Sequence, residues 1–334
     1  MNLLEQWSQL EETWACFPQT TPYSFKIGSF SICLKRDQSS LGNKLTKAFD
    51  HLKTEPNPSN DLTIFLWDTS LPGQKLPFLD WTSIQGNGYR GYWKPPLYIH
   101  YFEFINALSV LNVEENRAYY IVRDAETLPW WVSGSPLQVI LHTWFQERRI
   151  QLTHTAAIGN GKKALLLAGK GGSGKSTTAL ACLIRGLHYI AEDYSLLSPE
   201  TSPRVFSIYQ TAKWQPHTRT LFPEYEQFIA NPEEADKEKA LVYYQDIFPK
   251  QIAPSSQIQG IVSLEIGKEE RPVVRRADFQ STLKNLLMST LLQLPFNHEH
   301  TMSLLKATIS QTDHYHLLLG RDMNANIELI EQLL

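Results

Sequence analysis

The sequence predicts an α/β chain in which a mixed β-sheet with flanking helices follows a smaller α+β domain. Three observations support this. An apolar run at 164–168, a glycine-rich stretch and a helix-forming run at 177–185 come in direct succession. Short strand-like runs alternate with helical segments toward the C-terminus. The stretch Ser133-Gly134-Ser135-Pro136 interrupts the pattern, so we expect domains at 1–133 and 134–334.

Composition limits the class of protein. The 334 residues are 42% hydrophobic and 19% charged, which is enough apolar material for globular cores without disorder. A formal net charge of −3 gives no electrostatic reason to expect a nucleic-acid partner. Three scattered cysteines indicate neither a disulfide framework nor a zinc site. With no signal peptide and no apolar run near the ~18 residues of a membrane span, we expect a cytoplasmic protein that has no membrane partner.

The N-terminal part is rich in aromatic residues at strand spacing, and these are expected to form its core. Alternating patterns predict strands at 29–34, 62–67 and 117–122, an amphipathic helix at 43–52, and a hairpin at 86–93. We find no catalytic constellation there, so any role in binding a substrate rests on position alone.

The second part begins with a predicted helix up to Arg149, with Ser135 as its N-cap and Pro136 in its first turn. A strand from Ile150 to Ile158 contains His154. The Asn160-Gly161 pair is typical of a tight hairpin, so 164–168 is expected to return antiparallel to it.

Further along the chain, the same reasoning predicts strands, helices and one charged, proline-bearing mobile loop beside the site. The strands are 187–191, 194–198, 260–266 and 315–320, the helices are 279–294 and 326–334, and the loop is 223–239.

The glycine-rich stretch from Gly169 to Thr177 matches G-x-x-x-x-G-K-[ST], a phosphate-binding loop, and it has the strand before it and the helix after it that this motif requires. Glycines let successive backbone N–H groups point at one anion, and the helix start adds its positive dipole end. The expected nucleotide-binding residues are Gly169, Gly171, Gly172, Ser173, Gly174, Lys175, Ser176 and Thr177.

The cofactors that follow from this motif are ATP and Mg²⁺. Lys175 is expected to reach the β- and γ-phosphates, and the Ser176 hydroxyl to ligate the magnesium ion. The alternative is a plain glycine-rich turn between a strand and a helix. The loop contacts phosphates and not the base, so ATP and GTP stay equivalent at this point.

Two acids and a histidine complete the predicted site. Glu192 and Asp193 follow an apolar strand, which is the arrangement of a carboxylate pair facing a phosphate loop; the alternative is a solvated acidic turn. His154 lies on the strand expected beside the loop's own strand, where it can act as a base or bond an acid; a satisfied structural histidine is the alternative.

The stretch from His154 to Leu197 resembles the core of the HPr kinase/phosphorylase family and its HPr-kinase-like relatives. The resemblance rests on His154, the loop ending at Ser176, Arg185-Gly186, and Ala191-Glu192-Asp193. A looser likeness from Pro136 onward is to kinase-like proteins encoded beside peptide natural products such as lasso peptides. The resemblance implies a fold related to phosphoenolpyruvate carboxykinase, and oligomers are common in the family, so a homo-oligomer is possible.

The resemblance also implies roles. Lys175 and Ser176 would bind phosphates and magnesium, Asp193 would be a metal ligand, and Glu192 with His154 would activate the acceptor hydroxyl. Glu192 replaces the family's Asp, and the family's E-x-R-G-x-G signature is absent from 205–213, which argues against HPr as the substrate. Lys213 and Arg219 are candidates for supplying positive charge to the transition state.

Two main hypotheses follow from the sequence. The first is a kinase that transfers the γ-phosphoryl group of ATP to a hydroxyl, of Ser or Thr on a peptide or natural-product precursor, or of a small molecule. The second is a regulatory protein that binds ATP and transfers nothing. A motor or transport ATPase is a weaker third, because no partner signature is found.

Overall fold

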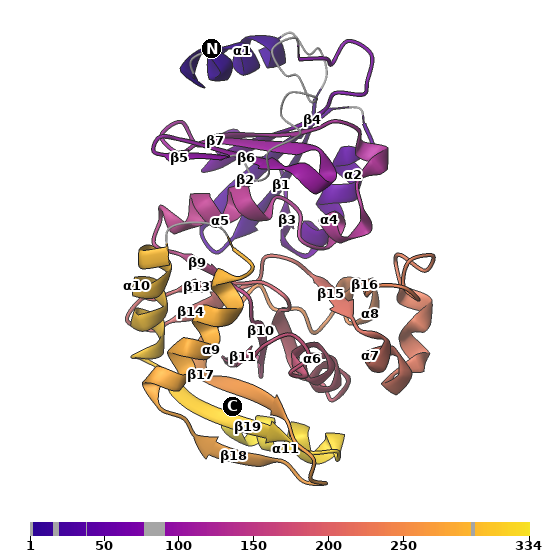
Figure 1. Ribbon diagram of the computed structural model, residues 1–334, viewed down its shortest axis with the longest axis vertical. Helices are drawn as coiled ribbons and strands as arrows, with labels where there is room; N and C mark the ends of the chain where they lie inside the picture. The colour runs from indigo at the N-terminus through magenta and orange to yellow at the C-terminus, as the bar shows by residue number, and fades with distance from the viewer. Residues whose placement is uncertain (1–2, 16–19, 38, 77–90, 295–297) are drawn as a thin grey trace. The chain divides into compact units, whose positions relative to one another are not determined.

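The computed structural model describes residues 3–15, 20–37, 39–76, 91–294 and 298–334 (Figure 1). It separates into two compact units, Met1–Lys47 with Lys53–Ile140, and Ala48–Leu52 with Leu141–Leu334. Whether either unit folds as a domain of its own, with the boundary expected at 133–134, stays a prediction. The predicted hairpin at 86–93 lies largely outside the described residues.

The described part of the first unit is a mixed eight-stranded sheet with the strand order β3-β1-β2-β4-β8-β7-β6-β5. The strands are β1 (Thr21–Ile27), β2 (Phe30–Arg36), β3 (Lys53–Thr54), β4 (Leu62–Asp68), β5 (Gly91–Lys94), β6 (Leu97–Phe102), β7 (Ala107–Asn112) and β8 (Arg117–Val122). The helical elements are α1 (Leu3–Ala15), α2 (Leu41–Thr46), η2 (Glu103–Ile105), η3 (Ala125–Thr127) and α4 (Trp130–Gly134). The three predicted strands are confirmed, and the predicted helix at 43–52 is α2 followed by the 3-10 turn η1 (Lys47–Leu52).

Aromatic side chains form much of this unit's core, as their strand spacing predicts. Trp7 and Leu10 lie on one face of α1 and pack with Trp67, Tyr119 and Ile121 of the sheet. Trp67 and Tyr119 are at most 1% exposed. These aromatic residues are therefore structural, as expected for rings that alternate along strands.

The second unit contains a nine-stranded mixed sheet with the path β12-β10-β11-β17-β14-β13-β9, to which β19 and β18 are added beside β17. Its strands are β9 (Gln151–Thr153), β10 (Ala156–Gly159), β11 (Lys163–Ala168), β12 (His188–Ala191), β13 (Ser195–Ser198), β14 (Arg204–Phe206), β17 (Ser255–Ile266), β18 (Val273–Arg276) and β19 (Asp313–Leu319). A separate two-stranded sheet pairs β15 (Thr211–Trp214) with β16 (Ala240–Tyr243). The chain is therefore of mixed α/β class.

Helices cover both faces of this sheet. α6 (Lys175–Ile184) and α11 (Met323–Leu333) lie on one face, and α9 (Phe279–Leu291) and α10 (His298–Ile309) on the other. The other helical elements are α5 (Gln138–Gln146), α7 (Pro216–Leu221), η4 (Pro223–Phe228) and α8 (Tyr244–Ile247). Alternation along β11 explains the layers: Leu165 and Leu167 pack under α6 and α11, whereas Leu166 packs with α9 and α10 on the other face. No helix in the described part of the chain is long and apolar enough to cross a membrane.

Two predicted elements need correction. The helix expected from Ser135 starts at Gln138, because Ser135 closes the short helix α4 and Leu137 has a left-handed φ of 58°. The strand expected at 150–158 is divided into β9 and β10. β9 pairs with β13, whereas β10 pairs with β11 and β12, so the chain changes sheet neighbours at His154. The hairpin of β10 with β11 is as predicted.

The segment expected as a mobile loop, 223–239, contains η4 and a series of turns.

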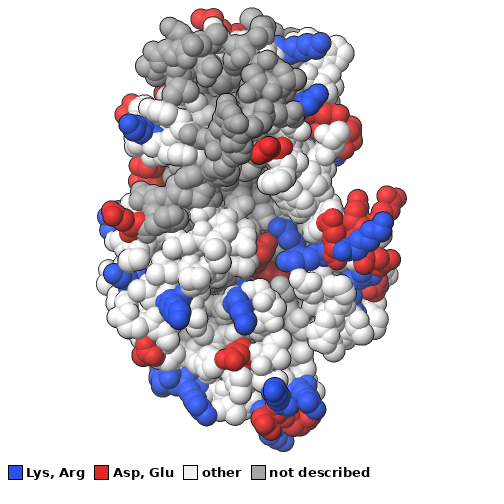
Figure 2. Space-filling view, in the orientation of Figure 1, with Lys and Arg blue, Asp and Glu red and all other residues white. Residues whose placement is uncertain are grey.

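Positively and negatively charged side chains are interspersed on the described part of the face shown in Figure 2.

A buried histidine makes the stability of the second unit sensitive to acid. His51 bonds Ser207 across 2.7 Å, and burial lowers its pKa to about 3. The unfolded chain binds a proton near pH 6.5 that the folded chain rejects, so the free energy of unfolding should fall as pH drops below about 6.5, by at most about 1.4 kcal/mol per unit. His51→Gln should flatten this slope in denaturant titrations at pH 4.5 to 7.5. Ser207→Ala, which removes the partner but no titrating group, should lower stability while keeping the slope; an unchanged slope in His51→Gln would contradict the assignment.

Candidate active site

The glycine-rich loop connects β11 to α6, as its motif predicts. Gly169, Gly172 and Gly174 have φ values of 149°, 79° and 95°, a region that side chains rarely adopt. α6 packs one side on the large sheet through Ala179 and Cys182 and the other on the small sheet through Leu180 and Leu183. The first turn of α6 is thus fixed between two sheets.

The loop has the features of an anion cradle. Cβ atoms built on Gly171 or Gly172 would meet nothing within 4 Å, so the chain there borders open space. The Ser173 hydroxyl is buried without a hydrogen-bond partner among the described residues. Buried polar atoms are normally paired, so this hydroxyl, beside glycines that border open space, fits a phosphate group.

Lys175 is held at the mouth of this loop. Its Nζ donates to the carbonyl oxygens of Gly169 at 2.7 Å and Lys170 at 3.3 Å, which leaves one of its three protons for a ligand. Burial lowers its pKa, and the charges of Asp193 and Glu192 oppose that effect. The Lys175 ammonium is therefore held at the loop by these hydrogen bonds and does not move freely in solvent.

Glu192 and Asp193 follow β12 and diverge at a tight turn. The backbone N–H of Tyr194 bonds the carbonyl of Glu192 at 2.7 Å, and Asp193 has a left-handed φ of 64°. A residue that is not glycine seldom adopts this conformation. The turn sends the two carboxylates to different partners.

The Glu192 carboxylate lies on the side of α6. It is 2% exposed and accepts a hydrogen bond from Tyr244 Oη at 2.9 Å, and the nearby Ser176 hydroxyl acts to lower its pKa. Trp214 Nε1 donates to the same tyrosine oxygen at 3.2 Å. Burial raises the pKa of Glu192 to about 7, against the opposing effect of these hydrogen bonds.

The Asp193 carboxylate contacts a histidine and a lysine side chain. His154 Nε2 lies 3.1 Å from Oδ1, and Lys213 Nζ lies 2.9 Å from Oδ2. Burial opposes the ionisation of Asp193, but Lys213 and His154 outweigh it and lower its pKa well below the usual range. His154 therefore pairs with Asp193 and not with Glu192, because the Glu192 carboxylate points toward Tyr244 instead.

Buried hydroxyls fix the position of His154 at the break between β9 and β10. Thr153, Thr155 and Ser195, each fully buried, bond one another on either side of it. The His154 backbone N–H also donates to Thr290 Oγ1 at 3.4 Å. The histidine is therefore held by its backbone as well as by Asp193.

These groups line one cavity of 280 Å³ in the second unit. Of the residues predicted from the sequence, His154, Gly171, Gly172, Ser173, Gly174, Lys175, Ser176, Thr177, Glu192, Asp193 and Lys213 line it. Gly169 does not, although its carbonyl holds Lys175. Arg219, on α7, instead pairs with Glu226 of η4 and with Asp236 later in the same segment. Arg219 is therefore a structural residue.

Several lining residues were missed by sequence reasoning. The cavity is also lined by Gln215, His217, Thr218 and Lys239. Tyr244 stabilises Glu192 by donating a hydrogen bond to its carboxylate. They carry no motif, because their positions depend on how β15 pairs with β16. Only the run of charges around Lys239 was visible in the sequence.

The residues present fit a nucleotide phosphate and magnesium. Ser176 and Glu192 offer two adjacent oxygens, and Mg²⁺ commonly binds one or two protein oxygens together with phosphate oxygens and water. Within the described ranges there is no cluster of three or more His, Cys, Asp or Glu side chains suited to a metal.

Comparison with known proteins gives little. No protein-family model matches the chain, and no curated protein matches it. Among solved structures, it is similar to the Hpr(Ser) kinase/phosphatase from Coxiella burnetii, with 14% sequence identity over 55% of this chain and 93% of that one, and a TM-score of 0.32. The likeness is weak, and neither a substrate nor an activity follows from it.

The glycine at the start of α6 provides a test of the loop. Gly174→Ala should reduce the free energy of unfolding by about 1–3 kcal/mol, since its φ is left-handed and the new Cβ would lie 2.7 Å from Leu319 Cδ1. Chemical denaturation measures this. Gly171→Ala is the matched control, with open space and an ordinary φ, and should change stability by under about 1 kcal/mol. Equal losses in both variants would contradict the described loop.

Proposed function

We propose that this chain is a phosphotransferase that moves the γ-phosphoryl group of ATP, with Mg²⁺, to a hydroxyl acceptor. The observation that carries the proposal is the second group of side chains in the cavity. A nucleotide-binding regulatory protein needs the phosphate loop, but it has no need of His154 and Lys213 held on one carboxylate beside that loop.

We infer that the two acids divide the work differently from the family pattern. Glu192 would help to hold the magnesium ion, because it and Ser176 at the start of α6 both line the cavity beside the glycine-rich loop. Asp193 supports the acceptor side, because it bonds His154. Ser176 and Glu192 would hold a magnesium ion, which would offset the negative charge of the phosphates.

The protein's own groups then act as follows. Lys175 and the loop N–H groups bind the phosphates, and Lys213 adds positive charge near the developing transition state. With its Nε2 proton donated to Asp193, His154 keeps an unprotonated Nδ1 that can accept the proton of the acceptor hydroxyl. The hydroxyl oxygen bonds the γ-phosphorus, the bond to the bridging oxygen breaks, and ADP leaves.

The cavity volume bears on the acceptor. At 280 Å³ it lies below the ~300–1,000 Å³ of sites that enclose a whole drug-sized ligand. It therefore suits phosphate groups and one hydroxyl, with the rest of the acceptor outside. That arrangement is compatible with a Ser or Thr of a peptide, which we prefer, and also with a small molecule.

Four further expectations stay predictions: a homo-oligomer, a cytoplasmic setting, no nucleic-acid partner and no membrane partner.

The phosphate loop is tested by nucleotide-dependent stability. ATP at 100 times its Kd should raise the free energy of unfolding by about 2.7 kcal/mol, and Lys175→Met should abolish this gain, because the buried ammonium that faces the phosphates is lost. Thermal unfolding with and without ATP and Mg²⁺ measures it. Lys162→Met, on the exposed β10–β11 turn, should retain the gain; retention in Lys175→Met would refute the loop assignment.

Phosphoryl transfer is tested by mass spectrometry of hydroxyl-bearing peptides incubated with protein, ATP and Mg²⁺, where a gain of about 80 Da marks one phosphoryl group. His154→Gln should keep ATP binding and slow transfer by about 100-fold or more, the usual range for a lost general base. Transfer at the original rate would remove His154 from the mechanism. ATP binding without acceptor-dependent ADP release, from peptides or small hydroxyl compounds, would favour the regulatory alternative.

A further inference from the structure

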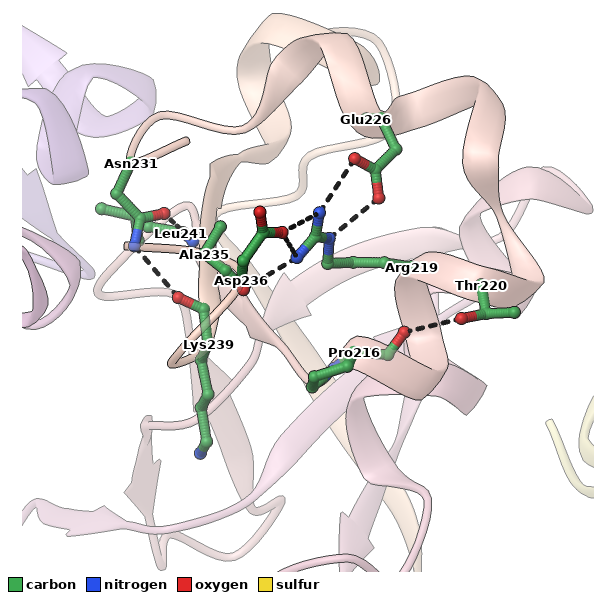
Figure 3. Close-up of polar contacts among 9 residues, drawn as sticks. All are labelled: Pro216, Arg219, Thr220, Glu226, Asn231, Ala235, Asp236, Lys239 and Leu241. Carbon is green, nitrogen blue, oxygen red and sulfur yellow. Dashed lines mark hydrogen bonds and ion pairs between the residues drawn. The ribbon is translucent and has the colours of Figure 1, made fainter. Parts of the chain in front are cut away.

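The segment between β15 and β16 is folded around one arginine (Figure 3). Arg219 Nε and Nη2 donate to both carboxylate oxygens of Glu226 at 2.8 and 3.0 Å, and its Nη1 donates to the Ala235 carbonyl at 2.8 Å. Asp236 accepts from the same guanidinium at 3.2 Å. A planar guanidinium with several fixed partners holds a segment more firmly than a single ion pair.

A buried asparagine then fixes the last residues of this segment. Asn231 is 5% exposed; its Nδ2 donates to the Lys239 carbonyl at 3.0 Å, and its Oδ1 accepts from the Leu241 N–H at 2.6 Å. Figure 3 shows this side chain bridging the backbone on either side of residue 240. The backbone of Lys239 is therefore set by two interactions, the asparagine bridge and the start of β16.

The Lys239 side chain lines the same cavity as the phosphate loop. Its carbonyl accepts a hydrogen bond from Asn231, but its ammonium makes no ion pair or hydrogen bond within the described part of the chain. The other two lysines of the cavity are engaged, Lys175 with loop carbonyls and Lys213 with Asp193. Lys239 also adds to the lowering of the Lys175 pKa, so the two ammonium groups lie within electrostatic reach of each other.

We propose that Lys239 is a further catalytic residue that binds the terminal phosphate of the nucleoside triphosphate; this rests on the proposed function. Two like charges at one cavity repel until an anion lies between them. The extra phosphate of a triphosphate supplies that anion, and a diphosphate does not. Lys239 therefore distinguishes ATP from ADP and offsets the charge that develops on the transferred group.

The experiment is calorimetric titration of the full chain with ATP and with ADP, each with Mg²⁺. Lys239→Met should weaken ATP binding by about tenfold or more, the usual effect of losing one charge-assisted hydrogen bond, and should change ADP affinity by less than about twofold. Lys239→Arg should recover most of the ATP affinity. Lys237→Met is the matched control, because this exposed lysine of the same segment does not line the cavity, and both affinities should stay unchanged.

An unchanged ATP affinity in Lys239→Met, or equal losses for ATP and ADP, would overturn the proposal and mark Lys239 as a solvated lysine. Lys239→Met should unfold at the same denaturant concentration as the original chain, since its side chain is exposed. A failure of the phosphate-loop assignment gives a different result, because the Lys175→Met variant would then bind ATP as tightly as the original chain does. In that case both inferences fail together.

Discussion

The site depends on one tight turn after β12. Because Asp193 adopts a left-handed conformation and Tyr194 bonds back to Glu192, two adjacent carboxylates leave the strand toward different elements. Glu192 reaches the start of α6, and Asp193 reaches the break between β9 and β10. A regular continuation of the strand would also separate the two side chains, but onto opposite faces of the sheet, with only one beside the phosphate loop.

The partners on each side stabilise this strained turn. Left-handed geometry at an aspartate costs on the order of 1–3 kcal/mol and persists only where its surroundings demand it. Here the demand is electrostatic, since Lys213 and His154 both bond Asp193, while Tyr244 bonds the buried Glu192. Removing either set would leave a buried carboxylate unpaired, which is far more costly than the turn itself.

Local patterns were sufficient for the elements that carry the phosphate loop. The apolar runs, the glycine spacing and the Asn160-Gly161 turn predict β10, β11 and α6, since each depends on residues close together in sequence. The break at His154 was missed, because it depends on the pairing of β9 with β13, which lies some 40 residues later in the sequence. The partners of Glu192 and Asp193 were assigned from a family pattern, and no sequence rule specifies the direction in which a left-handed residue sends its side chain. The position of Lys239 in the cavity could not be predicted either, because it depends on the hydrogen bonds of Asn231 and on the β15–β16 pairing.

The cavity thus combines two walls with different origins. The large sheet supplies the loop, His154 and both acids, whereas the small β15–β16 sheet and the segment between its strands supply Lys213, Gln215, His217 and Lys239. α6 is packed against both sheets, and Thr177 on it bonds Thr218 on α7 at 2.7 Å. A change in the small sheet would therefore move the cations of the second wall and would also disturb the packing of α6 at the end of the glycine-rich loop.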